Sequence, residues 1–502
     1  MRSARAASLQ AVQVLLVAAA CAGTSFAEQH DRGTTLSLEE CRIEHPRGLA
    51  SYAARCAVLE VPENPEDASG RKIGLRIAVV PAIDRRGARD PLFILSGGPG
   101  QAATDFYTSA APAFARIQRE RDIVLVDQRG TGGSNVLACP FPDEAELAQL
   151  DMERIRAFSR DCLKVLQGDP RYYTTSVAVR DLDAARAALG YERVNLYGIS
   201  YGTRVAQHYL RRYPQRTRAV ILDGVVPPQQ ILGIDSALLA QRALDRIFER
   251  CRTEPACHET FADPAGQFAA LRAEVEKRPA EIALPDPATG SVKRTRFSSG
   301  HLQVSIRLLT YSADRAALIP LLVHQAVKQR NYAPLAAHAE MISEQLGDQL
   351  AVGMHNAVVC TEDVPYYGAS AIDRGALAQT YLGTMQLDGL VASCEVWPRG
   401  VIDPDFHAPL LSSTPVLLLS GSVDPVTPPE YAERAAATLR NSRHLVLEGH
   451  GHGQLALGCM PRVMADFIDA ASGDDAAKKL DATCLAKATP APFFVSFAGP
   501  RP

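Results

Sequence analysis

The amino-acid sequence predicts an α/β fold built on a largely parallel sheet. Short runs of apolar and β-branched residues, bounded by turn residues, alternate along much of the chain with segments of helical periodicity. Such alternation is typical of parallel sheets whose strands are joined by helices. The later runs are almost wholly apolar, as expected for strands that helices cover on both faces. With 502 residues, of which 47% are hydrophobic and 22% charged, the chain is long enough for a sizeable core.

We expect eight strands in the sheet, with helices between several of them. The expected strands are Cys56–Val61, Ile73–Val80, Leu92–Leu95, Ile123–Val126, Val194–Tyr197, Ala219–Leu222, Val416–Leu419 and Leu445–Leu447. The expected helices include Val179–Leu189, Thr203–Tyr213, Tyr431–Leu439 and Val463–Ala470. Apolar residues recur in these helices at helical spacing, so one face of each would pack on the sheet.

One long stretch interrupts this alternation. Between Asp223 and Thr414, about 190 residues carry mainly helical patterns, and a structureless loop of that length is implausible in a compact domain. We therefore expect a large helical cap at residues 231–410, inserted into a core formed by residues 28–230 and 411–502. The expected helices of the cap are Ser236–Arg250, Pro264–Lys277, Ala313–Lys328 and Pro334–Gln345. Within it, the Pro- and Gly-bearing stretch Arg278–Gly300 is expected to be irregular.

The N-terminus is typical of a secretory signal peptide. Arg2 and Arg5 precede an apolar run from Ala11 to Ala22, and Ser25-Phe26-Ala27 supplies a small-x-small cleavage pattern. The run is short for the alternative, a membrane anchor, and no other apolar stretch is long enough to cross a bilayer. We expect residues 1–27 to be removed and the mature chain to be exported, to the periplasm or the medium.

The cysteines favour the same compartment. Eleven cysteines become ten once Cys21 leaves with the signal peptide, and an even number fits an oxidising environment. Connectivity does not follow from sequence alone; the simplest expectation joins neighbours along the chain: Cys41/Cys56, Cys139/Cys162, Cys251/Cys257, Cys360/Cys394 and Cys459/Cys484. Neither Cys-x-x-Cys nor His-Glu-x-x-His occurs, so the sequence predicts no metal site and no other cofactor.

The charge balance excludes one class of partner. Lys and Arg number 53 and Asp and Glu number 56, a net charge of −3. A near-neutral chain does not favour a nucleic-acid binder that works through a basic surface. No internal repeat is present, and the sequence predicts no particular oligomeric state.

A candidate nucleophile follows one of the expected strands. Gly198-Ile199-Ser200-Tyr201-Gly202 comes directly after Val194–Tyr197 and opens a helix, which is the strand–turn–helix context that Gly-x-Ser-x-Gly requires. Glycines suit such a turn because it is strained and crowded. We expect the turn to lift the Ser200 hydroxyl clear of the sheet.

A glycine turn follows another strand. The run Leu92–Leu95 leads into Ser96-Gly97-Gly98-Pro99-Gly100, where backbone N–H groups can approach a ligand closely. In an acyl-transfer enzyme such a turn supplies one donor of the oxyanion hole, and the residue after the nucleophile supplies the other. We expect Gly97 and Tyr201 to be these donors, with Gly98 as the alternative to Gly97.

Serine needs a base and an acid that orients the base. Asp424 follows the strand Val416–Leu419, and His452 follows Leu445–Leu447 in the run Gly449-His450-Gly451-His452-Gly453. The order Ser200, Asp424, His452 is that of an α/β-hydrolase triad. His450 and Asp223 are the alternatives. We prefer His452 for its place in the turn, and Asp424 because its strand directly precedes the histidine strand.

Three motifs carry a resemblance to a known family. Gly97-Gly98-Pro99-Gly100, the stretch Asp127-Gln128-Arg129-Gly130-Thr131-Gly132-Gly133-Ser134, and Gly198–Thr203 together resemble the α/β-hydrolase peptidases that include proline iminopeptidase and the secreted tripeptidyl aminopeptidases. The stretch from Asp127 lacks the pattern of a dinucleotide site, and we expect it to be a structural loop.

The resemblance covers most of the mature chain. From Thr414 to Cys484 it is to the C-terminal region of tripeptidyl aminopeptidases. Proline iminopeptidases usually have His before Gly-Gly-Pro-Gly and Trp after the nucleophile, where this chain has Ser96 and Tyr201. These departures favour the tripeptidyl-aminopeptidase branch.

The resemblance implies an exopeptidase that holds the free α-ammonium of its peptide substrate with an acid from the cap. The resemblance implies Glu362 as the first candidate for this acid and Asp363 as the second. A carboxylate in a dry cleft pairs well with an ammonium. The alternatives are an exposed acidic pair without that role, an esterase or other small-molecule hydrolase on the same scaffold, and a non-catalytic binding protein.

Overall fold

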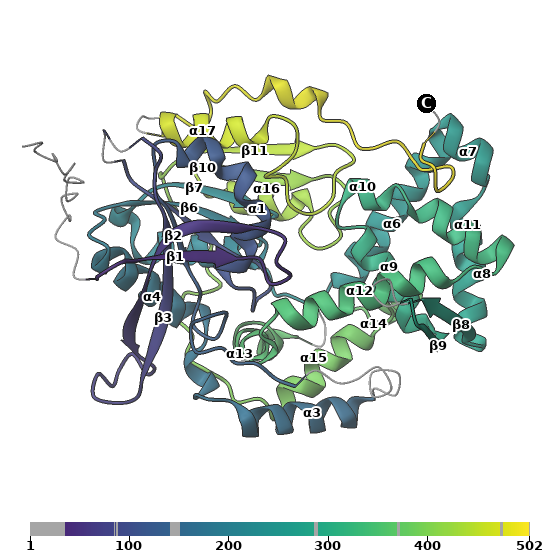
Figure 1. Ribbon diagram of the computed structural model, residues 1–502, viewed down its shortest axis with the longest axis horizontal. Helices are drawn as coiled ribbons and strands as arrows, with labels where there is room; N and C mark the ends of the chain where they lie inside the picture. The colour runs from purple at the N-terminus through teal and green to yellow at the C-terminus, as the bar shows by residue number, and fades with distance from the viewer. Residues whose placement is uncertain are drawn as a thin grey trace, which may run out of the picture.

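The computed structural model describes residues 36–84, 86, 89–140, 151–285, 290–368, 372–471 and 475–500. A single large sheet dominates this part of the chain, in the strand order β1-β2-β3-β5-β4-β6-β7-β10-β11 (Figure 1). The six strands from β5 to β11 in that order run parallel, and β1, β2 and β3 join them through antiparallel pairings. The expected α/β fold with a mostly parallel sheet is confirmed. The expected signal peptide, residues 1–27, lies outside the described residues.

All eight expected strands are present. They are β2 (Ser51–Pro62), β3 (Lys72–Val80), β4 (Leu92–Leu95), β5 (Ile123–Val126), β6 (Val194–Ile199), β7 (Thr217–Asp223), β10 (Val416–Gly421) and β11 (Ser442–Leu447). The ninth, β1 (Glu39–Glu44), was not predicted. It is an edge strand of charged residues in which only Ile43 is buried, so its sequence carries little apolar pattern.

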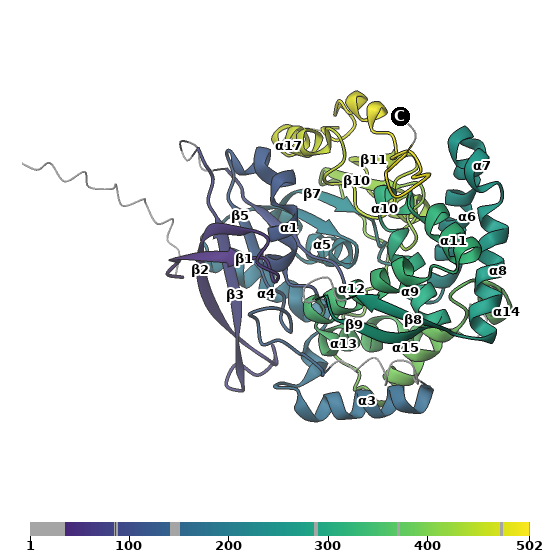
Figure 2. The same cartoon turned by 45° about the vertical axis from the view of Figure 1, so that its right-hand side comes forward.

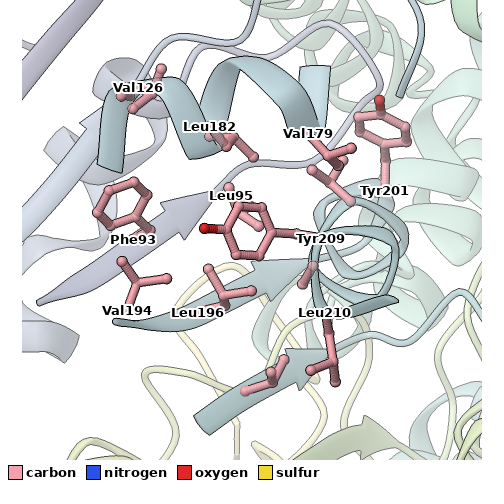
Figure 3. Close-up of a cluster of buried hydrophobic side chains, with 14 of the residues drawn as sticks. Phe93, Leu95, Val126, Val179, Leu182, Val194, Leu196, Tyr201, Tyr209 and Leu210 are labelled. Atoms are coloured by element: carbon pink, nitrogen blue, oxygen red, sulfur yellow. The ribbon is translucent and has the colours of Figure 1, made fainter. Parts of the chain in front are cut away.

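Helices cover both faces of the sheet, and the strands alternate accordingly. Leu92 and Ile94 of β4 pack with α1 (Ala103–Gln118) and α17 (Met460–Ala470) on one face. Phe93 and Leu95 pack with α4 (Thr175–Ala188) and α5 (Tyr201–Arg212) on the other, as Figure 3 shows. Burial on both faces explains why these strands read as continuous apolar runs. Of the remaining helices outside the segment between β7 and β10, α16 (Pro429–Ala436) packs against β10 and β11, and α3 (Met152–Val165) packs against α15 (Met385–Val396).

The segment between β7 and β10, residues 224–415, is here called the insertion. It is mainly helical, and most of it forms the right-hand part of the molecule in Figures 1 and 2, while α13 (Val352–Glu362) and α15 lie lower and nearer the centre. Its helices are α6 (Ser236–Thr253), α7 (Pro255–Phe261), α8 (Pro264–Lys277), α9 (Ser299–Leu309), α10 (Ala313–Ala316), α11 (Ile319–Gln329), α12 (Ala333–Gln349), α13 (Val352–Glu362), α14 (Arg374–Gln379) and α15 (Met385–Val396). Short 3₁₀ turns in the chain are Pro170–Tyr172, Pro214–Arg216, Val364–Tyr366 and Thr483–Lys487.

Two expectations for the insertion were wrong. The stretch Arg278–Gly300, expected to be irregular, holds a two-stranded antiparallel hairpin of β8 (Ala280–Pro285) and β9 (Val292–Phe297). The single helix expected at Ala313–Lys328 is two helices, α10 and α11. Pro320 lies in the first turn of α11, where a residue without an N–H begins a helix more readily than it continues one.

The insertion does not lie wholly outside the core. Ala351, Met354, Ala357 and Val358, at and within α13, belong to the same buried cluster as β4 and α5. The chain also returns to the glycine turn after β4 here: the N–H of Ala351 donates to the carbonyl of Gly100 at 3.0 Å. Residues of the insertion therefore touch the glycine turn singled out from sequence.

Disulfides join the ten described cysteines in the five expected neighbouring pairs. The pairs are Cys41–Cys56, Cys139–Cys162, Cys251–Cys257, Cys360–Cys394 and Cys459–Cys484. Cys360–Cys394 ties α13 to α15, and Cys41–Cys56 ties the outer strand β1 to β2. In the described part of the chain, none of the helices combines the length and hydropathy that a bilayer crossing needs.

Candidate active site

Ser200 occupies a strained turn between β6 and α5. Its backbone has φ +55° and ψ −125°, a conformation that residues with a side chain rarely adopt. The N–H of Ser200 donates to the carbonyl of Asp223 at 2.9 Å, and the carbonyl of Ser200 accepts the N–H of Thr203 at 2.9 Å. These bonds from β7 and α5 hold the turn that the sequence predicts.

Close contacts, and not a need for backbone flexibility, require glycine at both ends of the Gly-x-Ser-x-Gly motif. A β-carbon on Gly198 would lie 2.4 Å from the carbonyl oxygen of Gly202. A β-carbon on Gly202 would lie 2.2 Å from the carbonyl oxygen of Leu95, at the end of β4. Only glycine fits either position, because the start of α5 packs directly against β4 and β6.

The glycine turn after β4 lies beside the nucleophile. A β-carbon on Gly97 would stand 3.3 Å from Cβ of Ser200. Among the described residues, no backbone hydrogen bond uses the N–H of Gly97 or of Tyr201. Both donors predicted for an oxyanion hole therefore flank Ser200 with their N–H groups uncommitted. Gly98 adopts φ +107°, and a β-carbon there would meet the backbone of Gly100.

Asp424 and His452 are in direct contact. Oδ2 of Asp424 lies 2.7 Å from Nδ1 of His452. Oδ1 of Asp424 accepts the N–H groups of Val426 and Thr427, each at 2.9 Å, and Oδ2 accepts the hydroxyl of Thr427 at 2.7 Å. The carboxylate is thus held by its own turn and keeps the His452 proton on Nδ1. Nε2 of His452 is left as the acceptor.

His452 and Ser200 both contact the end of β7, at residues Asp223 and Gly224. A β-carbon on Gly224 would lie 2.8 Å from Cε1 of His452, and the preceding residue, Asp223, holds the N–H of Ser200 through its carbonyl. No hydrogen bond among the described residues involves the Ser200 hydroxyl. In serine hydrolases this bond often tightens only when substrate is bound. The imidazole and the turn of Ser200 therefore lie close together, but no hydrogen bond joins the imidazole to the Ser200 hydroxyl.

The alternatives named from sequence have other partners. Nε2 of His450 lies 3.1 Å from the carbonyl oxygen of Ala488, and the side chain is buried against the C-terminal segment. Asp223 is fully buried; it accepts the N–H of Gln454 at 2.8 and 2.9 Å, the N–H of Leu455 at 3.0 Å and the hydroxyl of Tyr197 at 2.9 Å. Asp223 holds the loop that carries His452, whereas Asp424 holds the imidazole itself.

Neighbouring carboxylates raise the pKa of the His452 imidazole. Burial opposes charging of His452, but the charge and hydrogen bond of Asp424, with a further contribution from Asp223, outweigh it and raise the pKa of His452. Burial also raises the pKa of Asp223 to about 6, although the N–H of Gln454 and the hydroxyl of Tyr197 oppose that shift. A base with a raised pKa takes up the serine proton more readily.

Residues that the sequence did not single out complete the surroundings of His452. Oγ1 of Thr427 lies 3.0 Å from Nδ1 of His452. From the insertion, the carbonyl of Tyr311 accepts the N–H of His452 at 2.8 Å, and the Tyr311 ring meets the imidazole edge to face with centroids 5.3 Å apart. Thr427 lies three residues after the predicted acid, Asp424, and this closeness in sequence could have indicated that its hydroxyl lies near the site. Tyr311 has no sequence signal, because its contact crosses from the insertion.

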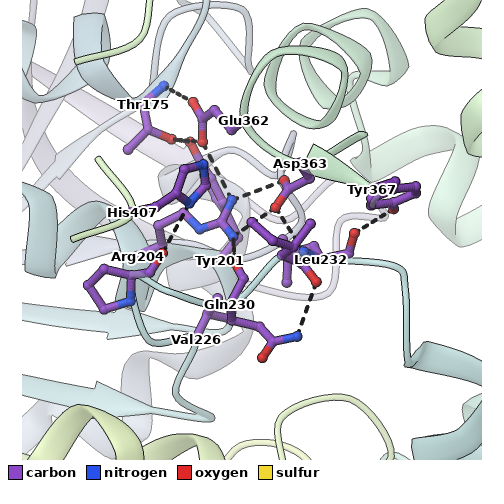
Figure 4. Close-up of polar contacts among 12 residues, drawn as sticks. Thr175, Tyr201, Arg204, Val226, Gln230, Leu232, Glu362, Asp363, Tyr367 and His407 are labelled. Carbon is purple, nitrogen blue, oxygen red and sulfur yellow. Dashed lines mark hydrogen bonds and ion pairs between the residues drawn. The ribbon is translucent and has the colours of Figure 1, made fainter. Parts of the chain in front are cut away.

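Glu362 and Asp363 are fully buried at the end of α13, not exposed. Oε1 and Oε2 of Glu362 accept the N–H and the hydroxyl of Thr175 at 2.6 and 2.9 Å, and Asp363 binds the Arg204 guanidinium through both oxygens at 2.9 and 3.0 Å (Figure 4). Arg204 also lies 3.6 Å from Glu362. The sequence indicated the acids but not this internal cation.

The acidic cluster connects to the residue after the nucleophile. The hydroxyl of Tyr201 lies 2.6 Å from that of Thr175, whose own contacts reach Glu362. Burial raises the pKa of Glu362 to about 7, although Arg204 opposes the shift. Two carboxylates thus share one guanidinium behind the start of α5, in a region closed to solvent.

The loop Asp127–Ser134 forms hydrogen bonds and an ion pair with elements outside the loop. Asp127 accepts the N–H groups of Thr104 and Gly133 at 3.0 and 3.1 Å. Arg129 is fully buried and forms a bidentate pair with Asp181 of α4 at 2.6 and 2.8 Å.

Comparisons with known proteins agree with the fold. Residues 90–253 match the family model of the alpha/beta hydrolase fold, and residues 379–484 match the model described as TAP-like protein. The first match contains β4, the nucleophile turn and α5, and the second contains β10, Asp424 and His452.

Three curated relatives illustrate the similarity. Serine protease Hip1 of Mycobacterium tuberculosis is 25% identical over 496 residues, covering 89% of this chain and 91% of the relative. Tripeptidyl aminopeptidase of Streptomyces coelicolor is 25% identical over 475 residues, covering 87% and 84%. Carboxylesterase B of Mycobacterium tuberculosis is 30% identical over 227 residues, covering 41% and 43%. With the fold and the matched models, these similarities identify the chain as a serine hydrolase of the α/β-hydrolase fold with a TAP-like C-terminal region.

Proposed function

We propose that this protein is an exported serine aminopeptidase that cleaves peptides from a free N-terminus. The observation that carries the proposal is the 2.7 Å hydrogen bond between Asp424 and His452. The imidazole of His452 lies beside Gly224, and the carbonyl of the preceding residue, Asp223, accepts the N–H of Ser200 in its strained turn. Similarity along most of the chain to a serine protease and a tripeptidyl aminopeptidase supports peptides as substrates.

In the proposed reaction, Nε2 of His452 takes the proton of the Ser200 hydroxyl as the oxygen attacks the scissile carbonyl. Asp424 keeps the imidazole oriented and stabilises the imidazolium. The N–H groups of Gly97 and Tyr201 stabilise the oxyanion, and losing one such donor typically costs about 10²–10³ in rate. The imidazolium then protonates the leaving amine as the C–N bond breaks. The acyl group is then bound as an ester to Oγ of Ser200. Water, deprotonated by His452, attacks the ester carbonyl; the bond between the acyl carbon and Oγ breaks, and the imidazolium returns its proton to Oγ.

Glu362 and Asp363 are proposed to make the protein selective for a free N-terminus. Two carboxylates facing one guanidinium leave the cluster with an excess of negative charge when both are ionised, and this excess lies behind the residue next to Ser200. An ammonium nearby would be stabilised by that charge in a region of low dielectric. Because both side chains already have internal partners, a direct contact would require Thr175 or Arg204 to shift.

Aminoacyl and tripeptidyl anilides with free and acetylated N-termini test the proposal. We expect hydrolysis of the free forms and loss of hydrolysis on acetylation. Equal rates for the free and blocked forms would reject the aminopeptidase and favour the second candidate, an esterase or small-molecule hydrolase. The similarity to carboxylesterase B over 227 residues favours that candidate, and short acyl esters are the substrates to include.

Export and domain organisation belong to the same proposal. Five disulfides favour an oxidising compartment, and residues 231–410 are proposed to act as the cap over the active site. N-terminal sequencing of the protein recovered from periplasm and medium is expected to begin at Glu28. Recovery of the uncut chain from the cytoplasm would reject export.

A further inference from the structure

A groove runs along the free edge of the sheet, outside the active site. It encloses about 1000 Å³ between β11, the second half of α6 and the C-terminal segment at residues 482–490. In Figure 1 the C-terminal part of the chain, coloured yellow, passes above β11 and runs on toward α7, where the chain ends. Ser422 and Gly449 line the groove, next to the loops of Asp424 and His452, but the candidate catalytic residues do not.

Three arginines line the groove: Arg246 and Arg250 from α6, and Arg443 from β11. Arg246 donates to the carbonyl of Ser422, and Arg443 to the carbonyl of Leu480. The guanidinium of Arg250 lies over the ring of Phe493, 4.1 Å from its centroid, and its buried Nε has no hydrogen-bond partner in the described part of the chain.

None of the three arginines has a carboxylate within ion-pair distance among the described residues. Two glutamates also line the groove, and Glu249 is paired with Arg252, which lies outside the lining. Beyond the lining, Glu254 acts electrostatically on Arg250, and Asp481 acts on Arg443, each from farther away than an ion pair. The lining itself therefore carries more positive than negative charge. A groove with this charge attracts anionic ligands.

The groove also presents an unpaired strand. β11 is the last strand of the sheet, and among the described strands β10 alone pairs with it. Such an edge presents backbone N–H and C=O groups to which another extended chain can add. Val446 on this edge is 46% exposed, and Leu485 and Ala488 line the opposite wall, so apolar side chains between the acidic ones would also find contacts.

We propose that this groove binds an extended acidic peptide segment, which adds to β11 as a further strand and places its carboxylates against Arg246, Arg250 and Arg443. The free strand edge accounts for an extended peptide, and the unpaired arginines account for the acidic side chains. Residues two apart in an extended chain lie on the same side and about 6.6 Å apart, so an alternating acidic and apolar sequence suits the groove.

Fluorescence anisotropy with designed peptides tests the site on the mature full-length protein carrying Ser200→Ala. The probe is a fluorescein-labelled, N-acetylated ten-residue peptide of alternating Glu and Val. One comparison peptide has Gln for every Glu, and a second has N-methylated Val, which removes the strand N–H groups. We expect each change to weaken binding at least about tenfold, as the loss of a charge-assisted contact implies, and added salt to weaken binding of the Glu peptide.

Two variants and a matched control locate the site. Arg443→Glu and Arg250→Gln are each expected to weaken binding of the Glu peptide at least about tenfold. Arg42→Glu, on the opposite edge strand β1, makes the same charge change as Arg443→Glu and is expected to leave the affinity unchanged. Thermal melting establishes whether each variant is folded. If a variant is not folded, the comparison of the Glu, Gln and N-methylated peptides on the protein without a groove substitution still tests the proposal.

Several results would overturn the proposal. Equal affinity for the Glu and Gln peptides would reject charge recognition, and undiminished binding of the N-methylated peptide would reject strand addition. An effect of Arg42→Glu as large as that of Arg443→Glu would reject the location. Tighter binding of a ten-nucleotide single-stranded DNA than of the Glu peptide would assign the groove to nucleic acid instead. Since no step requires catalysis, the outcome does not depend on the proposed aminopeptidase activity.

Discussion

The carboxylate of Asp223 binds the backbone N–H of Gln454 through both oxygens, at 2.8 and 2.9 Å. Gln454 lies two residues after His452, and the carbonyl of Asp223 accepts the N–H of Ser200. One residue at the end of β7 therefore ties the histidine loop and the nucleophile turn to the same point. This connection gives Asp223 a positioning role that differs from that of Asp424.

Asp223→Asn is expected to lower kcat by about 10²-fold with little change in KM, because a displaced imidazole loses its alignment with Ser200. The acid limb of the pH profile of kcat/KM should also move to lower pH, since the negative charge of Asp223 contributes to the raised pKa of His452. Steady-state kinetics between pH 4 and 9 measure both effects.

Asp127→Asn is the matched control for Asp223→Asn. Asp127, directly after β5, is fully buried like Asp223, and it also accepts two backbone N–H groups and a hydroxyl. Its loss should lower the melting temperature without moving the pH profile. The same shift of the profile in both variants would contradict a positioning role for Asp223.

Asp424→Asn should lower kcat by about 10⁴-fold while leaving the fold intact, because the imidazole loses the acceptor that keeps its proton on Nδ1. The charge and hydrogen bond of Asp424 raise the pKa of His452 against the effect of burial. The residual activity is therefore expected to have its acid limb at lower pH. An unchanged limb would mean that the titrating base is not His452.

Free-amine substrates should bind best in a narrow pH range. Burial raises the pKa of Glu362 to about 7, so its charge is lost as the pH falls below that value, and a substrate α-amino group loses its charge above about 8. KM is therefore expected to rise on both sides of this range. In Glu362→Gln the acidic limb of KM should disappear and KM should be raised throughout. A parallel change in KM for an acetylated ester would reject selection of the ammonium.

Acid sensitivity of the fold should depend on His208. Burial lowers the pKa of His208 to about 4, although Asp403, 2.8 Å from Nε2, opposes the shift. Between pH 6.5 and 4 the unfolded chain gains a proton that the native state does not, so stability falls as the pH falls, by at most about 3 kcal/mol from this group.

Denaturant unfolding at several pH values measures the contribution of His208. His208→Gln should flatten the dependence of the free energy of unfolding on pH between 6.5 and 4. His258→Gln, at an exposed position on α7, should leave the slope as it is. Equal slopes for the two variants would show that burial of His208 is not the cause.

The elements that the sequence predicted are those whose residues carry their own signal. β4 and β5 match their predicted bounds because both faces are buried and the runs are wholly apolar. β1 escaped prediction because a charged edge strand has little apolar pattern. β9 escaped because its sequence, Val292–Phe297, is charged and only Phe297 is buried. Both form only through pairing with a neighbouring strand, which a local pattern does not reveal.

The residues of the candidate site also fall into two groups, those that the sequence could indicate and those that it could not. Ser200, Asp424 and His452 could be indicated from sequence because each follows a recognisable strand and has glycines or a turn beside it. Arg204 and Tyr311 could not, because their contacts join segments more than 100 residues apart: Arg204 binds Asp363, and Tyr311 binds His452. The catalytic roles of the three candidates remain predictions until they are tested chemically.

Mass spectrometry after treatment with a fluorophosphonate tests the central claim most directly. The account predicts a single adduct on the peptide containing Ser200, absent in Ser200→Ala, and formed far more slowly in His452→Ala, whose melting temperature should remain near that of the unaltered protein. An adduct on another residue, or undiminished labelling of Ser200 in folded His452→Ala, would contradict the account.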